Sequence, residues 1–414
     1  MTTVIIGAGA AGMAAAVAAA RQGKQVLVLE QGRQPLRKLA ASGNGRGNLL
    51  NAGPPRYHGG EAFAREVLAR QPYETLRAFW QSVGVPLAEE AEGRVYPASR
   101  LASVAAEGLA QAAKRLGVRV QTDTAAIAVQ PCAQALEVHA LRAIRQPDTV
   151  LKSGRRKPGP VVRQEPCLYA AGQVIVATGG PAWPALGADG GGYALLSRLG
   201  HRIIPPRPAL CALITDPGPL KGLEGLRVRA ALSLLDAAGE TLCQSEGEAL
   251  FAADGVSGIA AMQLAREVRA GCTLRLDLRR AVMGTPGDAA DWLAKREGET
   301  LGARLTGAAA PALAHALLDA AGLRATDAPA PKALETLGRA IECFEVAVNG
   351  TRGMEAAQVT AGGADTREFN PADLQSRLVK GVHAAGEVLD VDGDCGGYNL
   401  MFAVASGLAA GQAK

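Results

Sequence analysis

The sequence of 414 residues is poor in aromatic side chains and has no closely spaced cysteines. Phe, Trp and Tyr make up 4% of the chain, which argues against a platform of aromatic rings that stacks nucleic-acid bases. The seven cysteines, from Cys132 to Cys395, are scattered, odd in number and without a Cys-x-x-Cys pair. This pattern argues against a disulfide framework or a zinc site. We therefore expect no bound metal and a reducing, cytoplasmic location.

Long apolar runs are also missing. No stretch approaches the roughly 20 apolar residues of a membrane span, so we expect no membrane association. The Ala-rich start resembles a signal peptide but lacks a basic leader, and its glycine spacing explains it better. A net charge of +5 is compatible with an anionic partner without requiring one. The length predicts two or three domains of roughly 150 residues each.

What the sequence does contain is a glycine motif at its N-terminus, Gly7-x-Gly9-x-x-Gly12. It follows an apolar strand expected at 3–6, opens an Ala-rich helix expected at 11–21, and precedes a strand expected at 25–30. In this context Gly7 permits a tight turn, Gly9 lets the backbone approach a pyrophosphate, and Gly12 lets the helix pack close to the sheet. The helix N-terminus, with Ala10 and Ala11, supplies free amides and the positive end of a dipole. The motif predicts a dinucleotide site.

Glu30 stands 18 residues beyond the last glycine, at the end of the second strand, with Gln31 beside it. A carboxylate there can accept hydrogen bonds from the adenosine ribose hydroxyls, and it repels a 2′-phosphate. The site therefore favours FAD or NAD over NADP.

Three distant segments change this prediction to FAD. Thr178-Gly179 ends a buried strand, Gly386-Glu387 ends another near the C-terminus, and Gly397 to Leu400 open the last helix. Glu387 suits the ribityl hydroxyls of a flavin. Amides at the start of the last helix, around Asn399, suit the flavin edge that becomes negative on reduction. Because only one complete dinucleotide motif exists, we expect any NAD(P)H donor to dock transiently.

The middle third of the chain differs in composition from both ends. It is strand-like from residue 208 to 278 and helical from 286 to 339, with Pro329 and Pro331 expected to mark a linker. It is expected to be an inserted domain. The basic loop 152–158 is expected to be a solvated tip.

Four segments of the chain resemble the BaiN/RdsA family of flavoproteins (the YhiN-like proteins). They are 4–12, 37–48, 251–263 with its Gly255-Val-Ser-Gly258, and 357–363 leading to 385–399. The resemblance covers essentially the whole chain. It implies an α/β fold with a Rossmann-like FAD-binding domain built from both chain ends, at 1–190 and 341–414. A β-barrel-like unit at 191–285 and a helical unit at 286–340 are inserted between them.

The resemblance also implies further cofactor contacts. Lys38 and the loop 42–48 are expected to wrap the flavin and pyrophosphate, through Gly43, Asn44, Gly45 and Asn48, and Ala126 is assigned to the same site. The family loop commonly reads Gly-Arg-Cys-Asn, whereas this chain has Gly45-Arg46-Gly47-Asn48. The family also often has Thr where Leu50 stands. This loop therefore offers no thiol that could act as an acid.

Members of the family are credited with reducing electron-poor C=C bonds, in an oxidised bile-acid ring or in a uracil of ribosomal RNA, and similar proteins are described as aminoacetone oxidases. Our leading hypothesis is hydride transfer from reduced FAD to an activated C=C bond, with a steroid-like enone or ribosomal uracil as substrate. Tyr398 and Tyr193 are candidate proton donors by motif proximity, although both could be packing or FAD contacts. The alternatives are a flavin amine oxidase that uses O₂ and an FAD-bearing RNA-binding protein. The sequence leaves the oligomeric state open.

Overall fold

The apolar runs near the N-terminus form the centre of a five-stranded parallel sheet, in the order β22-β13-β1-β2-β7. The computed structural model describes residues 2–133, 135–151, 154 and 156–414. The strands are β1 (Thr3–Ile6), β2 (Val26–Leu29), β7 (Arg119–Gln121), β13 (Gln173–Val176) and β22 (Val382–Ala384). Every residue of β1 and β2 is buried, as expected for strands covered on both faces. Because β22 pairs with β13, the C-terminal part of the chain completes the sheet that the N-terminal part begins.

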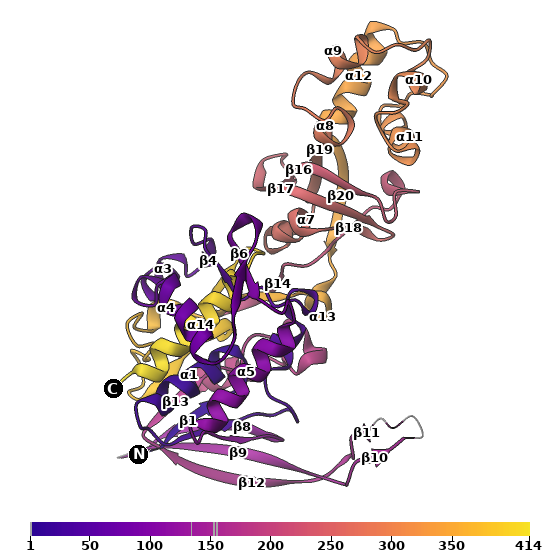
Figure 1. Ribbon diagram of the computed structural model, residues 1–414. Coiled ribbons are helices and arrows are strands. Elements are labelled where there is room, and N and C mark those ends of the chain that lie inside the picture. The colour runs from indigo at the N-terminus through magenta and orange to yellow at the C-terminus, as the bar shows by residue number, and fades with distance from the viewer. Residues whose placement is uncertain (1, 134, 152–153, 155) are drawn as a thin grey trace. The chain divides into compact units, whose positions relative to one another are not determined.

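Two small-residue helices bring the chain ends together. Helix α1 (Ala10–Arg21) is Ala-rich and packs against α14 (Tyr398–Gln412) (Figure 1). A Cβ atom added to Gly407 would lie 2.3 Å from the Ala11 carbonyl oxygen, and one added to Gly411 would lie 2.3 Å from the carbonyl oxygen of Ala15. Two glycines one turn apart on α14 therefore let the two backbones touch. The N-terminal glycine motif and the C-terminal motifs consequently share one unit.

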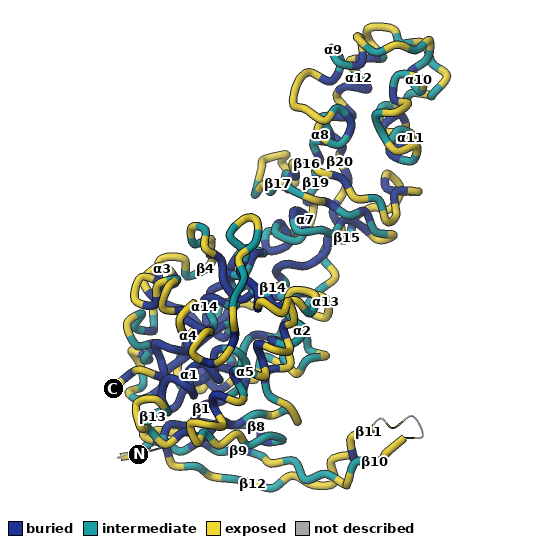
Figure 2. The backbone as a smooth tube through the Cα atoms, in the orientation of Figure 1, coloured by how far each residue is buried: buried dark blue, intermediate teal, exposed yellow. Residues whose placement is uncertain are grey.

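The remaining elements of this unit surround the sheet. The strands β12, β9 and β8 form an antiparallel sheet, and β6 pairs with both β3 and β5. Two-stranded pairs join β4 to β23, β10 to β11, and β14 to β21. Their bounds are β3 (Leu50–Asn51), β4 (Tyr57–Gly59), β5 (Leu87–Glu89), β6 (Arg94–Pro97), β8 (Thr124–Pro131), β9 (Leu136–Arg145), β10 (Thr149–Val150), β11 (Arg156–Lys157), β12 (Val161–Ala171), β14 (Ile203–Ala209), β21 (Val359–Ala364) and β23 (Val391–Gly393). The helices are α2 (Arg37–Ala41), α3 (Glu61–Arg70), α4 (Tyr73–Ser82), α5 (Ala102–Arg115) and α6 (Gly191–Arg198). The core of buried side chains runs through this unit, as the dark blue segments of Figure 2 show.

The inserted part forms a closed barrel in the order β15-β18-β17-β16-β19-β20. Helices α8 to α12 lie in sequence between β19 and β20. The strands are β15 (Leu213–Thr215), β16 (Arg227–Leu235), β17 (Thr241–Ala252), β18 (Gly255–Ser257), β19 (Thr273–Asp277) and β20 (Phe344–Thr351). The helices are α7 (Ile259–Leu264), α8 (Arg279–Val282), α9 (Ala289–Ala294), α10 (Leu301–Leu305), α11 (Pro311–Ala320), α12 (Pro331–Glu342) and α13 (Gly353–Ala356). The predicted barrel-like and helical parts are thus both present.

The chain divides into unit 1, Met1–Pro206 with Val359–Lys414, and unit 2, Arg207–Gln358. These boundaries differ from the expected ones after residues 190 and 340, because α6 continues unit 1 and β20 closes the barrel of unit 2. The expected linker at Pro329 and Pro331 is corrected, since Pro331 is the first residue of α12, a position that suits proline. Lys152, Ser153 and Arg155 of the predicted basic tip lie outside the described residues. Within the described residues, no helix has both the length and the apolar character needed to cross a membrane.

Candidate functional site

The glycine motif forms the turn between β1 and α1. Gly7 has φ +103°, and a Cβ atom added to it would lie 2.5 Å from the Ala177 carbonyl oxygen. A Cβ atom on Gly12 would lie 2.0 Å from the carbonyl oxygen of Gly7. Gly9 differs, because no heavy atom lies within 4 Å of its added Cβ. Gly7 and Gly12 thus serve close packing, while Gly9 leaves open space beside the backbone, as a pyrophosphate requires.

Glu30 follows β2 and contacts the same turn. One carboxylate oxygen accepts a hydrogen bond from the Ala8 amide at 2.9 Å, and the other accepts one from the Gly32 amide at 2.7 Å. The residue is half-buried, and each oxygen keeps a further acceptor position. Its place beside the glycine turn suits the predicted contact with a ribose. The amide of the adjacent Gln31 side chain donates to the Gly187 carbonyl at 2.7 Å.

Lys38 and Glu387 form an ion pair at 2.8 Å that joins α2 to the turn after β22. The Lys38 ammonium also donates to the Ala182 carbonyl at 3.2 Å. Glu387 accepts from the Thr360 amide at 2.9 Å, and the Thr360 hydroxyl accepts from the Ala182 amide at 3.1 Å. The predicted ribityl ligand Glu387 is therefore already fixed by a lysine and a backbone amide. Thr360 lies in the 357–363 motif but was absent from the predicted contacts.

The loop 42–48 turns sharply through left-handed conformations, with φ of +57° at Gly43, +53° at Asn44 and +82° at Gly45. No heavy atom lies within 4 Å of a Cβ added to Gly45. The side-chain oxygen of Asn48 is buried and has no hydrogen-bond partner among the described residues. A buried acceptor without a partner is a group that a bound ligand can satisfy.

The end of this loop and the strand β3 that follows it contact the segment before α14. The Asn51 side chain donates to the Gly396 carbonyl at 2.7 Å. Gly397, the residue before α14, has φ +103°, and a Cβ atom on it would lie 2.4 Å from the Leu50 carbonyl and 2.7 Å from the Asn48 side-chain oxygen. Glycine is therefore required where the loop and the helix start meet.

The N-terminus of α14 has no side-chain cap, so its first amides stay available to a ligand. The Asn399 side chain instead holds the preceding turn, accepting from the Gly393 amide and donating to the Gly393 carbonyl, both at 2.8 Å. The backbone amide of Asn399 belongs to the uncapped first turn, whose amides stay available to a ligand. Leu400 is half-buried in the first turn of the helix.

The loop after β13 carries the remaining predicted contacts. Gly179 has φ +73° and no heavy atom near an added Cβ, while the Thr178 hydroxyl lies 1.9 Å from the place where a Cβ on Gly192 of α6 would be. Ala126 lies on β8 opposite Ala140, beside a bulge in the pairing with β9. The predicted contacts from Gly7 to Leu400 all belong to unit 1.

The two tyrosine candidates occupy different surroundings. The Tyr193 hydroxyl is buried and has no partner among the described residues, and burial, with the charges of Glu387 and Asp390, raises its pKa well above the usual range. The Tyr398 ring packs edge-on against Tyr57, with centroids 5.9 Å apart, and burial raises its pKa. Both groups stay protonated at neutral pH and are weak acids.

These residues fit a dinucleotide cofactor. Open space lies beside Gly9, Gly45 and Gly179, uncapped amides begin α1 and α14, and two buried polar atoms, on Asn48 and Tyr193, have no partner in the described part of the chain. Open backbone and unused polar atoms are what a ligand with phosphates, hydroxyls and a polar ring requires.

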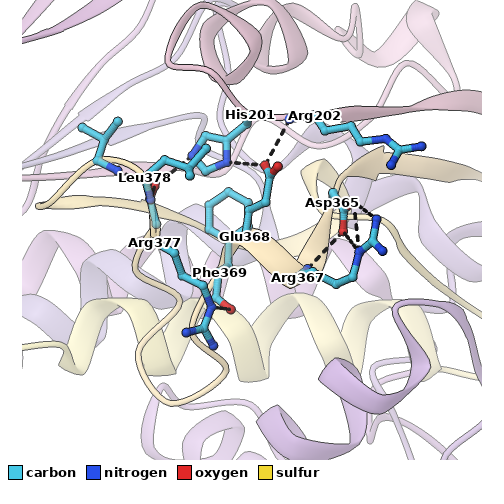
Figure 3. Close-up of polar contacts among 10 residues, drawn as sticks. His201, Arg202, Asp365, Arg367, Glu368, Phe369, Arg377 and Leu378 are labelled. Atoms are coloured by element: carbon cyan, nitrogen blue, oxygen red, sulfur yellow. Dashed lines mark hydrogen bonds and ion pairs between the residues drawn. The ribbon is translucent and has the colours of Figure 1, made fainter.

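A second polar cluster has the residue order of a hydrolase triad but not its accessibility. His201 Nδ1 lies 2.9 Å from the Glu368 carboxylate (Figure 3). The Ser376 hydroxyl lies 2.9 Å from His201 Nε2. Ser376 and His201 are buried, and the serine oxygen also accepts from the Leu378 and Val379 amides. The cluster therefore stabilises the fold rather than presenting a nucleophile.

Comparison with known proteins gives matches along the whole chain. The model of the family described as HI0933-like protein Rossmann domain matches residues 1–413. The chain is 34% identical to the 3-dehydro-bile acid delta(4,6)-reductase of Clostridium scindens, across 99% of the chain and 98% of that protein. It is 27% and 28% identical to the ribosomal RNA dihydrouridine synthases of Escherichia coli and Haemophilus influenzae. Those alignments cover 99% and 98% of the chain and 96% of each relative.

Proposed function

The chain belongs to the HI0933-like family of Rossmann-domain proteins, and from that premise we propose that it is an FAD-dependent reductase of C=C bonds conjugated to a carbonyl group. The family is the BaiN/RdsA family that the sequence motifs resemble, a family of flavin-dependent oxidoreductases. The proposal adds the identity of the cofactor, the bond reduced and the class of substrate.

The observation that supports the choice of FAD is that both chain ends fold into one unit, where β22 pairs with β13 and α14 packs against α1. The glycine turn and Glu30 come from the N-terminal part, while Glu387 and the start of α14 come from the C-terminal part. An NAD site needs the first half alone, whereas a flavin bound through its ribityl chain and ring needs the second half as well.

Each group has a defined task in this proposal. The amides at α1 bind the pyrophosphate, Glu30 binds the ribose, and the uncapped amides at α14 stabilise negative charge at the pyrimidine edge of the ring. The Lys38–Glu387 pair positions opposite charges beside the ribityl segment. Reduced FAD, when bound, supplies the hydride.

The substrate class rests on the relatives. A bile-acid enone and the uracil ring share a C=C bond conjugated to a carbonyl, and this is the chemistry that the named relatives have in common. We favour a steroid-like enone, because the identity to the bile-acid reductase is higher. An amine oxidase receives no support from these relatives. A transient NAD(P)H donor and a cytoplasmic location stay predictions.

The test separates cofactor, donor and acceptor. The purified protein is extracted to distinguish FAD from FMN, then reduced anaerobically with NADH, NADPH or dithionite. The reduced protein is mixed with a 3-oxo-Δ4 steroid, with unmodified ribosomal RNA, or with buffer. Stoichiometric flavin reoxidation by the steroid is the expected result. Reoxidation by RNA alone would move the substrate to uracil. No reoxidation by either, with reduction of the oxidised enzyme by an amine, would overturn the proposal.

A further inference from the structure

His58 lies on β4, which pairs with β23 in the segment that leads to α14. Successive side chains of a strand point to opposite faces, and here Tyr57 points inward against Tyr398 and Phe402 while His58 points outward. The His58 side chain is 43% exposed. The imidazole can therefore exchange protons with solvent while its backbone is held in a sheet.

Asp394 fixes the orientation of this ring. His58 Nε2 lies 2.9 Å from one Asp394 carboxylate oxygen. A carboxylate at this distance directs the Nε2 proton toward itself and stabilises the positively charged ring, whose Nδ1–H then becomes a donor. Among the described residues, no hydrogen-bond partner is paired with Nδ1. The Nδ1–H group of His58 can therefore donate a hydrogen bond or a proton to a bound molecule.

The pair lies beside the short segment that joins β23 to α14. The Asp394 amide donates to the Arg56 carbonyl at 3.1 Å, which links the two strands next to the pair. Asn399, in the first turn of α14, holds Gly393 through both its backbone groups. Asp394 therefore stands in the short turn between a clamped strand and the uncapped start of α14.

We propose that His58, oriented by Asp394, is the proton donor of the reductive reaction. This inference rests on the proposed function. The substrate C=C bond gains a hydride at its β-carbon, with both electrons, from the reduced cofactor. The imidazolium Nδ1–H gives its proton to the α-carbon, and water reprotonates the exposed ring. The products are the saturated carbonyl compound and the oxidised cofactor.

The other acidic side chains nearby are less suited to this task. Burial raises the pKa values of Tyr193, Tyr398 and the Cys395 thiol, which makes each a weaker acid. A general acid works best when its pKa is near the operating pH, which is the range in which an imidazole titrates. The loop position where the family carries a thiol is Gly47.

The test compares H58Q with a matched control. His139 on β9 is also a half-exposed histidine near a carboxylate, with Nε2 3.7 Å from Glu137 but without a hydrogen-bond partner in the described residues, so H139Q replaces a histidine of unit 1 outside the proposed pair. Each holoenzyme is reduced anaerobically and mixed in single turnovers with the steroid enone, with ribosomal RNA, and with ferricyanide, which takes electrons without forming a C–H bond. We expect H58Q to slow reoxidation by the organic acceptor about 100-fold or more, with ferricyanide unaffected. H139Q should match the wild type.

Two further measurements separate proton donation from a structural role. Imidazole added to H58Q should restore part of the rate of reoxidation. The solvent isotope effect on that rate should differ between H58Q and the wild type. In ¹⁵N NMR spectra of the five histidines, the His58 Nε2–H signal, assigned by its loss in H58Q, should move in D394N. If H58Q loses flavin, H58N and D394N take its place in the same assays.

The outcomes are distinct. Reoxidation of H58Q by the organic acceptor at the wild-type rate overturns the role of His58 and leaves the proposed function intact. An equal loss with ferricyanide also overturns it, since the defect would not concern the proton. Failure of the wild type to reduce either organic acceptor overturns the proposed function and this inference together.

Discussion

Gly9 and Gly12 provide the sharpest test of the dinucleotide turn, because adding the same methyl group to each should have opposite consequences. A Cβ on Gly12 would lie 2.0 Å from the Gly7 carbonyl oxygen and 3.4 Å from the Ala177 side chain. A Cβ on Gly9 would meet no heavy atom within 4 Å. Gly9 also has φ −78° and ψ −171°, which alanine adopts without strain.

The magnitudes follow from these contacts. Overpacking of this kind costs about 1–3 kcal/mol, so G12A should destabilise the cofactor-free protein by that amount. For a unit of about 260 residues, an unfolding entropy of roughly 2.1 cal/mol/K per residue gives a fall in Tm of about 2–5 °C. G9A should leave the cofactor-free protein unchanged or stabilise it by up to about 1 kcal/mol, because alanine restricts the unfolded chain.

The order reverses for cofactor affinity. If the pyrophosphate packs on the open side of Gly9, the new methyl group competes for that space, and the same overpacking cost raises the Kd for FAD roughly 5- to 150-fold. Thermal unfolding of the cofactor-free variants and fluorescence titration with FAD measure the two quantities. A G9A protein that binds FAD with wild-type affinity would refute the assignment of this turn to the cofactor.

Three further predictions concern other parts of unit 1. E387Q removes a negative charge beside the proposed cofactor site, and K38M removes a positive one. The flavin reduction potential, measured by dye-linked titration, should therefore rise in E387Q and fall in K38M by roughly 20 mV or more. Potentials equal to that of the wild type would place the pair away from the flavin. Y193F removes a buried hydroxyl that has no partner in the described residues, so the cofactor-free protein should gain about 1 kcal/mol in chemical unfolding while FAD affinity falls; a loss of stability would contradict this. The Arg367 guanidinium beside Asp365 lowers the pKa of that carboxyl. The ion pair therefore stabilises the fold above the ordinary carboxyl pKa, and this stabilisation is lost as the pH falls through the lowered value. In urea unfolding between about pH 2 and pH 7, the free energy of unfolding should fall less steeply with acid in D365N than in the wild type.

Local patterns in the sequence were sufficient for the sheet and its glycine turn. The apolar runs at 3–6 and 173–176 became β1 and β13, and the expected closing helix from Gly397 became α14. These elements are fixed by short-range features, namely strand-length apolar runs and a helix-breaking glycine before each helix. The expected domain boundaries differ from those of the observed units because they were placed where the composition of the sequence changes. The units themselves are defined by contacts between segments that lie far apart in the sequence. The sequence of β20, at 344–351, predicts a strand but not that the strand belongs to the barrel.

Side-chain partners were harder to predict than site membership. Glu387 was expected to face ribityl hydroxyls, but its first contacts are Lys38 and the Thr360 amide, which come from segments 349 and 27 residues away in sequence. The amides around Asn399 were expected to face the flavin, and that stays a prediction; the contact of the Asn399 side chain with Gly393 was not predicted. No local spacing rule relates Lys38 to Glu387, because their contact arises only after both chain ends have folded against one another. His58 carried no motif, and only the pairing of β4 with β23 brings it to Asp394.

Gly47 shows why the proton donor should differ in this chain. The residue has φ +72°, and a Cβ atom on it would lie 2.9 Å from the Cα atom of Ala102 at the start of α5. A cysteine at this place, as the family resemblance leads one to expect, would combine a strained backbone with a clash against a helix backbone that cannot rotate away. The thiol is therefore incompatible with the close approach of α5 to the loop. The proposed reductase reaction would then need its proton from another element, and His58 on β4 is the donor that we propose.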